Sequence, residues 1–331
     1  MNDQPDSSVV EMLVELACRA PSVHNSQPWR WRYSDGYLDL FTDRSRLLET
    51  IDPTARQMVI SCGAALDHLR RAAVTFRWTT DVDALPVPCS PEHLARVHLV
   101  HGAHPQSHEF DLLTAINRRH SDRRPFRPAP SGPLVTEYMK QAAARYDTQI
   151  TVLSPQARDT LAKASRLSAG IRKYDATYQA EIRWWAGHSF AEGGIPPDAL
   201  ARRSESSNVA LGRRFPEPRG SGIRAGSTTS IDESTVVLLS TKSDRRLDWL
   251  RCGQALSSIL LEATTEGLAT CPLTHLTEQS GSRALVESLA PKSGVPQVLI
   301  RLGAPPAGEV PKPTPRRPMS AVLTAQGQRI R

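Results

Sequence analysis

The stretch SCGAALDHLRRAA, residues 61–73, recurs later in the chain as RCGQALSSILLEA, residues 251–263. Both copies carry Cys-Gly-x-Ala-Leu at the same offset, and apolar residues return every three or four positions in each. That spacing is typical of a helix with a buried face. The recurrence at a distance of 190 residues predicts two equivalent helices that arose by internal duplication.

The flanks of these helices repeat as well. An apolar run with strand character, followed by a polar turn, precedes each helix, at 37–46 (YLDLFTDRSR) and at 235–246 (TVVLLSTKSDRR). Another strand-like run follows each helix, at 96–100 (RVHLV) and at 297–303 (QVLIRLG). Each half of the chain therefore predicts a strand–helix–strand unit. We expect an α+β fold in which helices pack against mixed β-sheets.

The chain length favours two halves, because 331 residues exceed what one ordinary core holds. We place the halves at 1–115 and 116–331. Residues 186–230 are rich in glycine, proline and serine and far exceed a usual connection. This segment is either a disordered insertion or a functional lid. Further helices are expected at 8–20, behind a serine cap, and at 165–185.

The composition narrows the class of protein. With 39% hydrophobic and 23% charged residues, the chain reads as a globular protein rather than a disordered one. No apolar run approaches the length that spans a bilayer, and the N-terminal MNDQPDSS has no signal-peptide character. We therefore expect a cytoplasmic protein that does not bind membranes. Five cysteines without a CxxC pair predict reduced thiols rather than disulfides or zinc ligands.

Other sites have little support in the sequence. His101, His104 and His108 have metal-like spacing, but Pro105 interrupts them and no carboxylate or cysteine completes a set. We expect no metal. The chain lacks GxSxG, GxGxxG and Walker motifs, which argues against a serine hydrolase, a Rossmann domain and a P-loop NTPase.

Positive charge is concentrated in two places. The net charge is +7, and arginines gather in NRRHSDRRPFR, residues 117–127, and in KPTPRRP, residues 312–318. Such runs are often solvated faces, but they also suit an anionic partner. We do not expect nucleic acid as that partner, because aromatic residues make up only 5% of the chain and no recognised binding motif occurs.

One loop combines rigidity with polarity. In APSVHNSQPWRW, residues 20–31, Pro21 and Pro28 fix the entry and exit of the chain. Tryptophans at 29 and 31 alternate as in a strand with one buried face. The polar side chains, which suit either a ligand or the local backbone, are Ser22, Asn25 and Gln27.

This loop resembles the flavin loop of the nitroreductase superfamily. Nearly the whole chain is similar to the mycobacterial Acg-type proteins, in which two nitroreductase-like repeats are fused in one polypeptide. The resemblance implies a nitroreductase-like fold with FMN at the interface of the repeats. It also implies that residues 186–230 form a lid over the flavin.

The resemblance assigns site residues one by one. The Arg-x-Ser-x-basic segment that binds the FMN phosphate corresponds to Arg119, Ser121 and Arg123, with His120 presenting its backbone. The basic residue that closes on the same phosphate corresponds to Arg316 or Arg317. The loop contacts to the ribityl chain and pyrimidine edge fall on Pro21, Ser22, Asn25 and Gln27. The turn that faces the isoalloxazine ring corresponds to Pro272, Leu273 and Thr274.

Two details qualify this assignment. Many nitroreductases carry Glu-Gly in the turn, where this chain has Thr274 and His275. The flavin loop and the phosphate segment each occur once, in opposite halves, so we expect one FMN per chain. Arginine suits this role because its planar guanidinium binds phosphate oxygens in bidentate fashion.

Two functions follow from the resemblance. The first is an FMN oxidoreductase that takes electrons from transiently bound NAD(P)H and reduces nitroaromatics or quinones. No side chain needs a catalytic role there, since the flavin carries the chemistry. The alternative is a flavin-sequestering or redox-sensing protein whose lid blocks nicotinamide. The fused halves would form a pseudo-dimer, and the sequence leaves monomer and dimer open.

Overall fold

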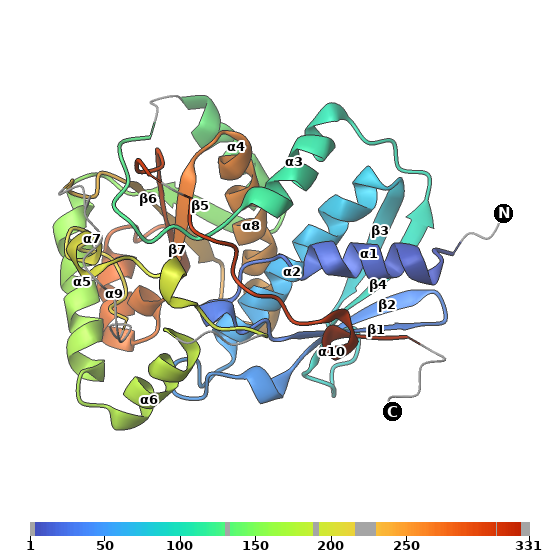
Figure 1. The fold of residues 1–331 in the computed structure, drawn as a ribbon, viewed down its shortest axis with the longest axis horizontal. Helices are drawn as coiled ribbons and strands as arrows, with labels where there is room; N and C mark the ends of the chain where they lie inside the picture. The colour runs from blue at the N-terminus through green and yellow to red at the C-terminus, as the bar shows by residue number, and fades with distance from the viewer. Residues whose placement is uncertain (1–3, 130–132, 188–191, 216–229, 309, 326–331) are drawn as a thin grey trace.

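The computed structural model describes residues 4–129, 133–187, 192–215, 230–308 and 310–325. Two β-sheets and the helices around them make up the fold (Figure 1). No helix within these ranges is long and apolar enough to cross a lipid bilayer.

The first sheet has the strand order β3-β4-β2-β1-β9. Its strands pair antiparallel except β9, which lies parallel to β1. Their bounds are β1 Trp29–Ser34, β2 Tyr37–Thr42, β3 Trp78–Ala84, β4 His93–His101 and β9 Leu323–Ala325.

The second sheet is antiparallel, with the order β5-β6-β8-β7. Its strands are β5 Thr148–Val152, β6 Thr235–Thr241, β7 Ala269–Leu273 and β8 Val295–Gly303. All four strand-like runs that flank the repeated motif lie in or overlap strands, which confirms that part of the prediction.

The helices are α1 Ser7–Ala17, α2 Arg56–Thr75, α3 Ser107–Arg118, α4 Pro133–Ala144, α5 Ala157–Arg172, α6 Ala176–Trp185, α7 Arg203–Ser206, α8 Arg246–Thr265, α9 Ser280–Ser288 and α10 Met319–Val322. The two repeated motifs form α2 and α8, which run side by side through the middle of the molecule (Figure 1). Both helices are predominantly buried.

The repeated glycines let α2 and α8 approach closely. A Cβ at Gly63 would overlap the Leu250 carbonyl oxygen and lie 3.0 Å from Gly253 Cα. A Cβ at Gly253 would overlap the Ile60 carbonyl oxygen and lie 2.9 Å from Gly63 Cα. Gly63 therefore faces Leu250, three positions before Gly253, and Gly253 faces Ile60, three positions before Gly63. The contact between the two helices is symmetric. The duplication itself, and the division at residue 115, stay predictions.

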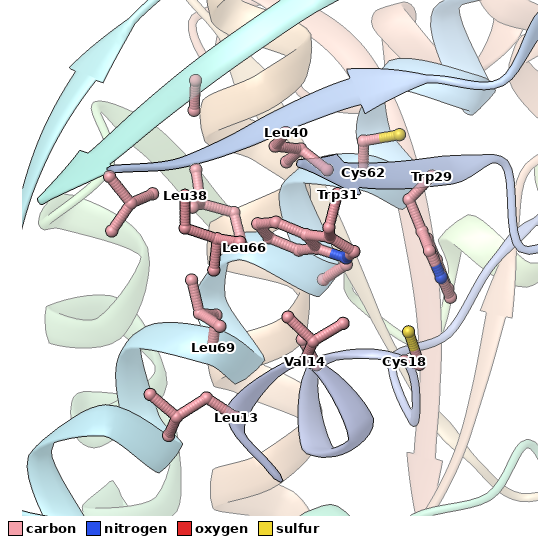
Figure 2. Packing of buried hydrophobic residues seen from close by; sticks show 14 of the residues in the cluster. Leu13, Val14, Cys18, Trp29, Trp31, Leu38, Leu40, Cys62, Leu66 and Leu69 are labelled. Carbon is pink, nitrogen blue, oxygen red and sulfur yellow. The ribbon is translucent and has the colours of Figure 1, made fainter. Parts of the chain in front are cut away.

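The core of the first half lies between α1, α2 and the first sheet (Figure 2). Trp29 and Trp31 are buried, whereas Arg30 between them is exposed, which confirms the expected alternation. Figure 2 shows the Trp31 indole among leucines from β2 and α2, and the Trp29 indole on the side of Cys18 and Cys62. All five cysteines are free, and all but Cys89 are buried.

Two predicted helix boundaries were wrong. The first helix begins at Ser7 and ends at Ala17, and its cap is Asp6, whose carboxylate accepts a hydrogen bond from the Val9 backbone N–H. The predicted helix at 165–185 is two helices, α5 and α6. The break occurs where the Asp175 carboxylate accepts from the Tyr178 N–H and so caps a new helix.

The expected lid segment, 186–230, is described in part. Residues 188–191 and 216–229 lie outside the described ranges. Residues 192–215, which we call the cover segment, contain a short 3-10 turn at Pro197–Ala199 and the four-residue helix α7.

Candidate functional site

A cavity of about 1110 Å³ is lined by residues from both halves of the chain. Its volume lies at the upper end of the range for small-molecule and cofactor sites, roughly 300–1,000 Å³. The lining draws on residues 21–24 after α1, on α2, on 121–123, on 271–275 at the end of β7, and on 195–215 of the cover segment. Among the predicted site residues, the cavity brings together Pro21, Ser22, Ser121, Arg123, Pro272, Leu273 and Thr274.

The flavin loop has an unusual backbone. His24, Asn25 and Gln27 have φ values of 48°, 55° and 49°, in the left-handed region, which is unfavourable for residues other than glycine. The loop is held by Ser22 Oγ, which accepts from the Gln27 N–H at 3.0 Å, and by Ser61 Oγ, which accepts from the Val23 N–H at 3.1 Å. Such strain persists where surrounding contacts fix it and concentrates at binding sites.

Asn25 and Gln27 do not line this cavity, and their side chains bind protein instead. Asn25 Nδ2 donates to the carbonyl oxygens of Gly194 (2.9 Å) and Pro315 (3.0 Å), and its Oδ1 accepts from Arg316 at 3.2 Å. Gln27, fully buried, accepts from the Arg317 N–H at 2.9 Å. The two amides thus join the loop to the cover segment and to the C-terminal segment. Their contact with a flavin stays a prediction, and the structure gives them other partners.

A prediction follows for Asn25. Asn25→Ala should lower the free energy of unfolding of the flavin-free protein by about 2–3 kcal/mol, since two or three hydrogen bonds and a residue suited to positive φ are lost. Urea unfolding measures the change. The matched control is Asn117→Ala in α3, because Asn117 is exposed and donates only to the Leu113 carbonyl oxygen of its own helix. Equal effects of both changes would contradict the joining role.

The predicted phosphate segment is extended. Ser121 forms a parallel bridge with Thr270, and the Asp122 N–H donates to the Thr270 carbonyl oxygen at 2.9 Å. Alternate residues of an extended chain share a face, so Arg119, Ser121 and Arg123 lie on one side. His120 contributes its carbonyl oxygen to Thr270 Oγ1 at 3.5 Å, and its ring contacts the Arg118 carbonyl oxygen at 3.2 Å.

Arg119 and Arg316 lie together next to the cavity wall. Both donate to the carbonyl oxygen of Arg19, at 3.5 and 3.2 Å, and neither lines the cavity. Within the described ranges, Nε and Nη1 of Arg119 and Nε of Arg316 have no hydrogen-bond partner. Burial, reinforced by the charge of Arg316, lowers the pKa of Arg119 to about 9. Burial, with the charge of Arg19, lowers the pKa of Arg316 to about 10.

Arg317 is placed differently from Arg316. It forms an ion pair with Asp43 at 3.1 Å and donates to the carbonyl oxygens of Gln27 and Ala321. Arg316 also donates to protein oxygens, those of Asn25, Thr314 and Pro315 among them, but no described carboxylate pairs with it. Because the charge of Arg317 is already matched by Asp43, Arg316 fits an anion-binding role better than Arg317 does.

Arg123 lines the cavity without a carboxylate partner. Its Nη1 donates to the carbonyl oxygens of Ala199 (3.0 Å) and Ser121 (3.4 Å), and its guanidinium lies over the Phe215 ring. No described carboxylate forms an ion pair with Arg119, Arg123 or Arg316. Burial lowers the pKa of Arg123 as well. One buried arginine, Arg119, and two half-buried ones, Arg123 and Arg316, thus lack a neutralising acid among the described residues.

The turn after β7 brings an unexpected histidine to the cavity. His275 Nε2 lies 3.1 Å from Ser165 Oγ, and Nδ1 has no partner within the described part of the chain. His24 also lines the cavity with an unpartnered Nδ1, and its ring meets Phe215 edge-on at 5.6 Å. Burial and neighbouring arginine charge lower the pKa of both rings well below the usual value, so both are neutral at pH 7.

Sequence reasoning missed these cavity residues for different reasons. His24 lies in the loop at residues 20–31, and His275 directly follows Thr274. The sequence pattern assigned neither histidine a role. No sequence motif indicated a site role for Gln57, Ser61 or Arg213. These residues reach the cavity because of how α2 and the cover segment pack. Within the described ranges, no three His, Cys, Asp or Glu side chains gather as metal ligands would.

The donor set suits a flavin mononucleotide. Guanidinium groups with open donor atoms match a phosphate. Pro272 and Leu273, which were predicted in a turn but end strand β7, supply an apolar wall. Arg119, Ser121, Arg123 and Arg316 would hold the phosphate, and Pro21, Ser22, Pro272, Leu273 and Thr274 would face the rest of the molecule. When bound, FMN would supply two-electron redox chemistry that the side chains lack.

The α+β fold, with its two sheets and a cofactor-sized cavity lined from both halves, is that of a nitroreductase-type protein. The Nitroreductase family model matches residues 116–304, and the chain belongs to this family. The match confirms the predicted family, and the residues it covers do not include the loop at 20–31.

The relatives include two proteins of Mycobacterium tuberculosis strain ATCC 25618 / H37Rv. "Putative NAD(P)H nitroreductase acg" is 40% identical over 318 residues, covering 96% of each chain. "Uncharacterized protein Rv3127" is 44% identical over 315 residues, covering 94% of this chain and 91% of that one. A solved nitroreductase with bound FMN from Bacteroides fragilis is 17% identical, and the match covers 61% of this chain and 91% of that chain with a TM-score of 0.39.

Proposed function

We propose that this protein is an FMN-dependent NAD(P)H oxidoreductase that reduces nitroaromatic compounds or quinones, with one FMN per chain. The observation that supports the proposal is a set of three arginines without a carboxylate partner among the described residues: buried Arg119 and half-buried Arg316, which meet at the Arg19 carbonyl oxygen, and half-buried Arg123, which lines the cavity. Burying unpaired charge is costly, so the arrangement requires an anionic ligand. Family membership makes FMN the ligand of choice.

The protein's own part would be positioning and shielding. Ser121 and the arginines hold the anionic end, and the turn at 272–274 sets the plane of the aromatic part. His24 and Phe215 wall the cavity on the side of the cover segment. Both neutral histidines present an unpartnered ring nitrogen, suited to hydrogen-bond an oxygen of an acceptor. Both halves contribute to this one site, so a second copy of the chain is not required.

The cover segment favours a second candidate. Residues 195–215 form much of the cavity lining. The start of the cover segment is hydrogen-bonded to the loop at residues 20–31. The Gly194 N–H donates to the Asn25 carbonyl oxygen at 3.2 Å, and Gln27 Nε2 donates to the Glu192 carbonyl oxygen at 3.3 Å. If this cover stays closed, the protein would sequester flavin or sense its redox state, and nicotinamide could not reach the ring.

One spectrum separates the two candidates. The purified protein should show a flavin absorption band that bleaches on anaerobic addition of NADPH and returns on addition of a nitroaromatic or quinone. A band that persists with NADPH but bleaches with dithionite would favour sequestration or sensing. A protein that shows no flavin band, even after reconstitution with FMN, would contradict both candidates.

A further inference from the structure

The charged side chains among the described lining residues of the cavity are all positive. Within the described part of the chain, its lining includes seven arginines and neither aspartate nor glutamate: Arg123, Arg166, Arg202, Arg203, Arg213, Arg214 and Arg301. The chain as a whole holds 34 acidic residues, so their absence from this wall is not a matter of composition. A concave surface lined by one sign of charge concentrates ligands of the opposite sign.

Two of these arginines are already matched by carboxylates. Arg301 forms a buried ion pair with Asp232 at 2.6 Å and also binds the Arg124 carbonyl oxygen. Arg213 pairs with Glu278 and donates to Tyr178 Oη at 2.8 Å. Both bind structural partners, and Arg123 is assigned to the FMN phosphate. The remaining arginines are exposed and lie at the mouth of the cavity.

The mouth arginines come from separate segments. Arg166 projects from α5, while Arg202 and Arg214 stand before and after α7 in the cover segment. In the described part of the chain, none of these three forms an ion pair. A solvated arginine run would lie along one element. Here Arg166 of α5 and Arg202 and Arg214 of the cover segment line the same cavity.

We infer that Arg166, Arg202 and Arg214 form a second phosphate subsite, which takes the phosphomonoester of a nucleotide that enters the cavity over the flavin. The inference rests on the proposed function and deepens it, because it selects NADPH over NADH as reductant. The cavity lining also includes apolar residues of the cover segment, among them Ile195, Leu200 and Phe215. They provide contact area for the aromatic part of such a ligand.

The test uses FMN-loaded protein and redox-inactive probes. Calorimetry should show that adenosine 2′,5′-bisphosphate binds at least about 10-fold more tightly than 5′-AMP at low salt, and that added salt weakens the difference because the mouth is exposed. Arg166→Gln/Arg214→Gln should weaken bisphosphate binding about 10-fold without changing FMN content. The control Arg30→Gln/Arg145→Gln removes the same charge from exposed positions outside the cavity lining and should change neither.

The outcomes distinguish this inference from the proposed function. Equal binding of the bisphosphate by both double variants, in protein that retains FMN, would overturn the second subsite and leave the proposed function standing. Inorganic phosphate that binds as tightly as the bisphosphate would overturn the nucleotide assignment. Protein that cannot be loaded with FMN fails the proposed function, and bisphosphate binding to that flavin-free protein still tests the mouth arginines.

Discussion

Arg119→Met should abolish tight FMN retention while leaving the flavin-free protein at least as stable as the wild type. The buried guanidinium has unpartnered nitrogens and no carboxylate partner among the described residues. Methionine fills similar space without charge and removes the cost of burying it. Loss of one charge-assisted phosphate contact should weaken FMN binding roughly 10- to 100-fold.

The sign of the stability effect follows from the pKa. Burial lowers the pKa of Arg119 to about 9, well below the ordinary value of an arginine, so the folded protein binds this proton less strongly than the unfolded chain does. The group therefore destabilises the flavin-free fold at all pH values below about 9, and that penalty disappears as pH rises between the two values. At neutral pH the methionine variant escapes the penalty.

Two measurements check this prediction. Dialysis followed by absorbance gives the FMN-to-protein ratio, and calorimetry gives the Tm of the flavin-free form. Arg30→Met, at an exposed position on β1, is the control and should retain FMN. Arg119→Lys keeps the charge without the planar fork and should give intermediate affinity. An unchanged FMN ratio in Arg119→Met, or a large fall in its flavin-free Tm, would contradict the phosphate role.

Gly253→Ala is expected to have the largest effect on stability. The added Cβ would overlap the Ile60 carbonyl oxygen of α2 and lie 2.9 Å from Gly63 Cα. Backbone atoms of a buried helix cannot rotate away from a clash as a side chain can, so α2 and α8 must move apart. Overpacking in cores costs about 1–3 kcal/mol and sometimes more, and we expect at least about 3 kcal/mol at this contact. Gly63→Ala should behave alike, because its contacts mirror those of Gly253.

The matched control is Gly170→Ala in α5. It is the same substitution in a helix, but nothing lies within 4 Å of the added Cβ. There alanine should stabilise by roughly 0.5–1 kcal/mol through its higher helix propensity. Denaturant unfolding of the three variants gives the comparison. Similar effects at Gly253 and Gly170 would show that the close approach of α2 and α8 does not limit stability.

The sequence predicted features that depend on local pattern. The repeated Cys-Gly-x-Ala-Leu motif gave both central helices because periodicity reports a buried face. The alternation of Trp29 and Trp31 gave the inward face of β1. Even the convergence of the loop with Ser121 and Arg123 from the other half was expected, although only through a family resemblance and not through the residues alone.

What the sequence did not predict depends on contacts between distant segments. Nothing near Asn25 indicates that Gly194 and Pro315 are its partners, more than 150 residues away. The break between α5 and α6 follows from one aspartate cap inside a continuous helical pattern, which periodicity overlooks. Arg316 and Arg317 are neighbours with equal charge, yet they have different partners: Arg316 donates to the Arg19 carbonyl oxygen, whereas Arg317 pairs with Asp43.

The parallel pairing of β9 with β1 also bears on how the chain folds during synthesis. Trp31 lies opposite Leu323 in the first sheet, so β1 keeps an open edge until nearly the whole chain has left the ribosome. Figure 1 shows the red C-terminal segment crossing from the second half to reach that edge. An open edge strand can pair with other chains, and long-range pairing is slow. Pairing in the first sheet can begin early in synthesis, but its last strand, β9, follows all strands of the second sheet. The nascent chain is therefore most prone to aggregate while β1 still lacks β9.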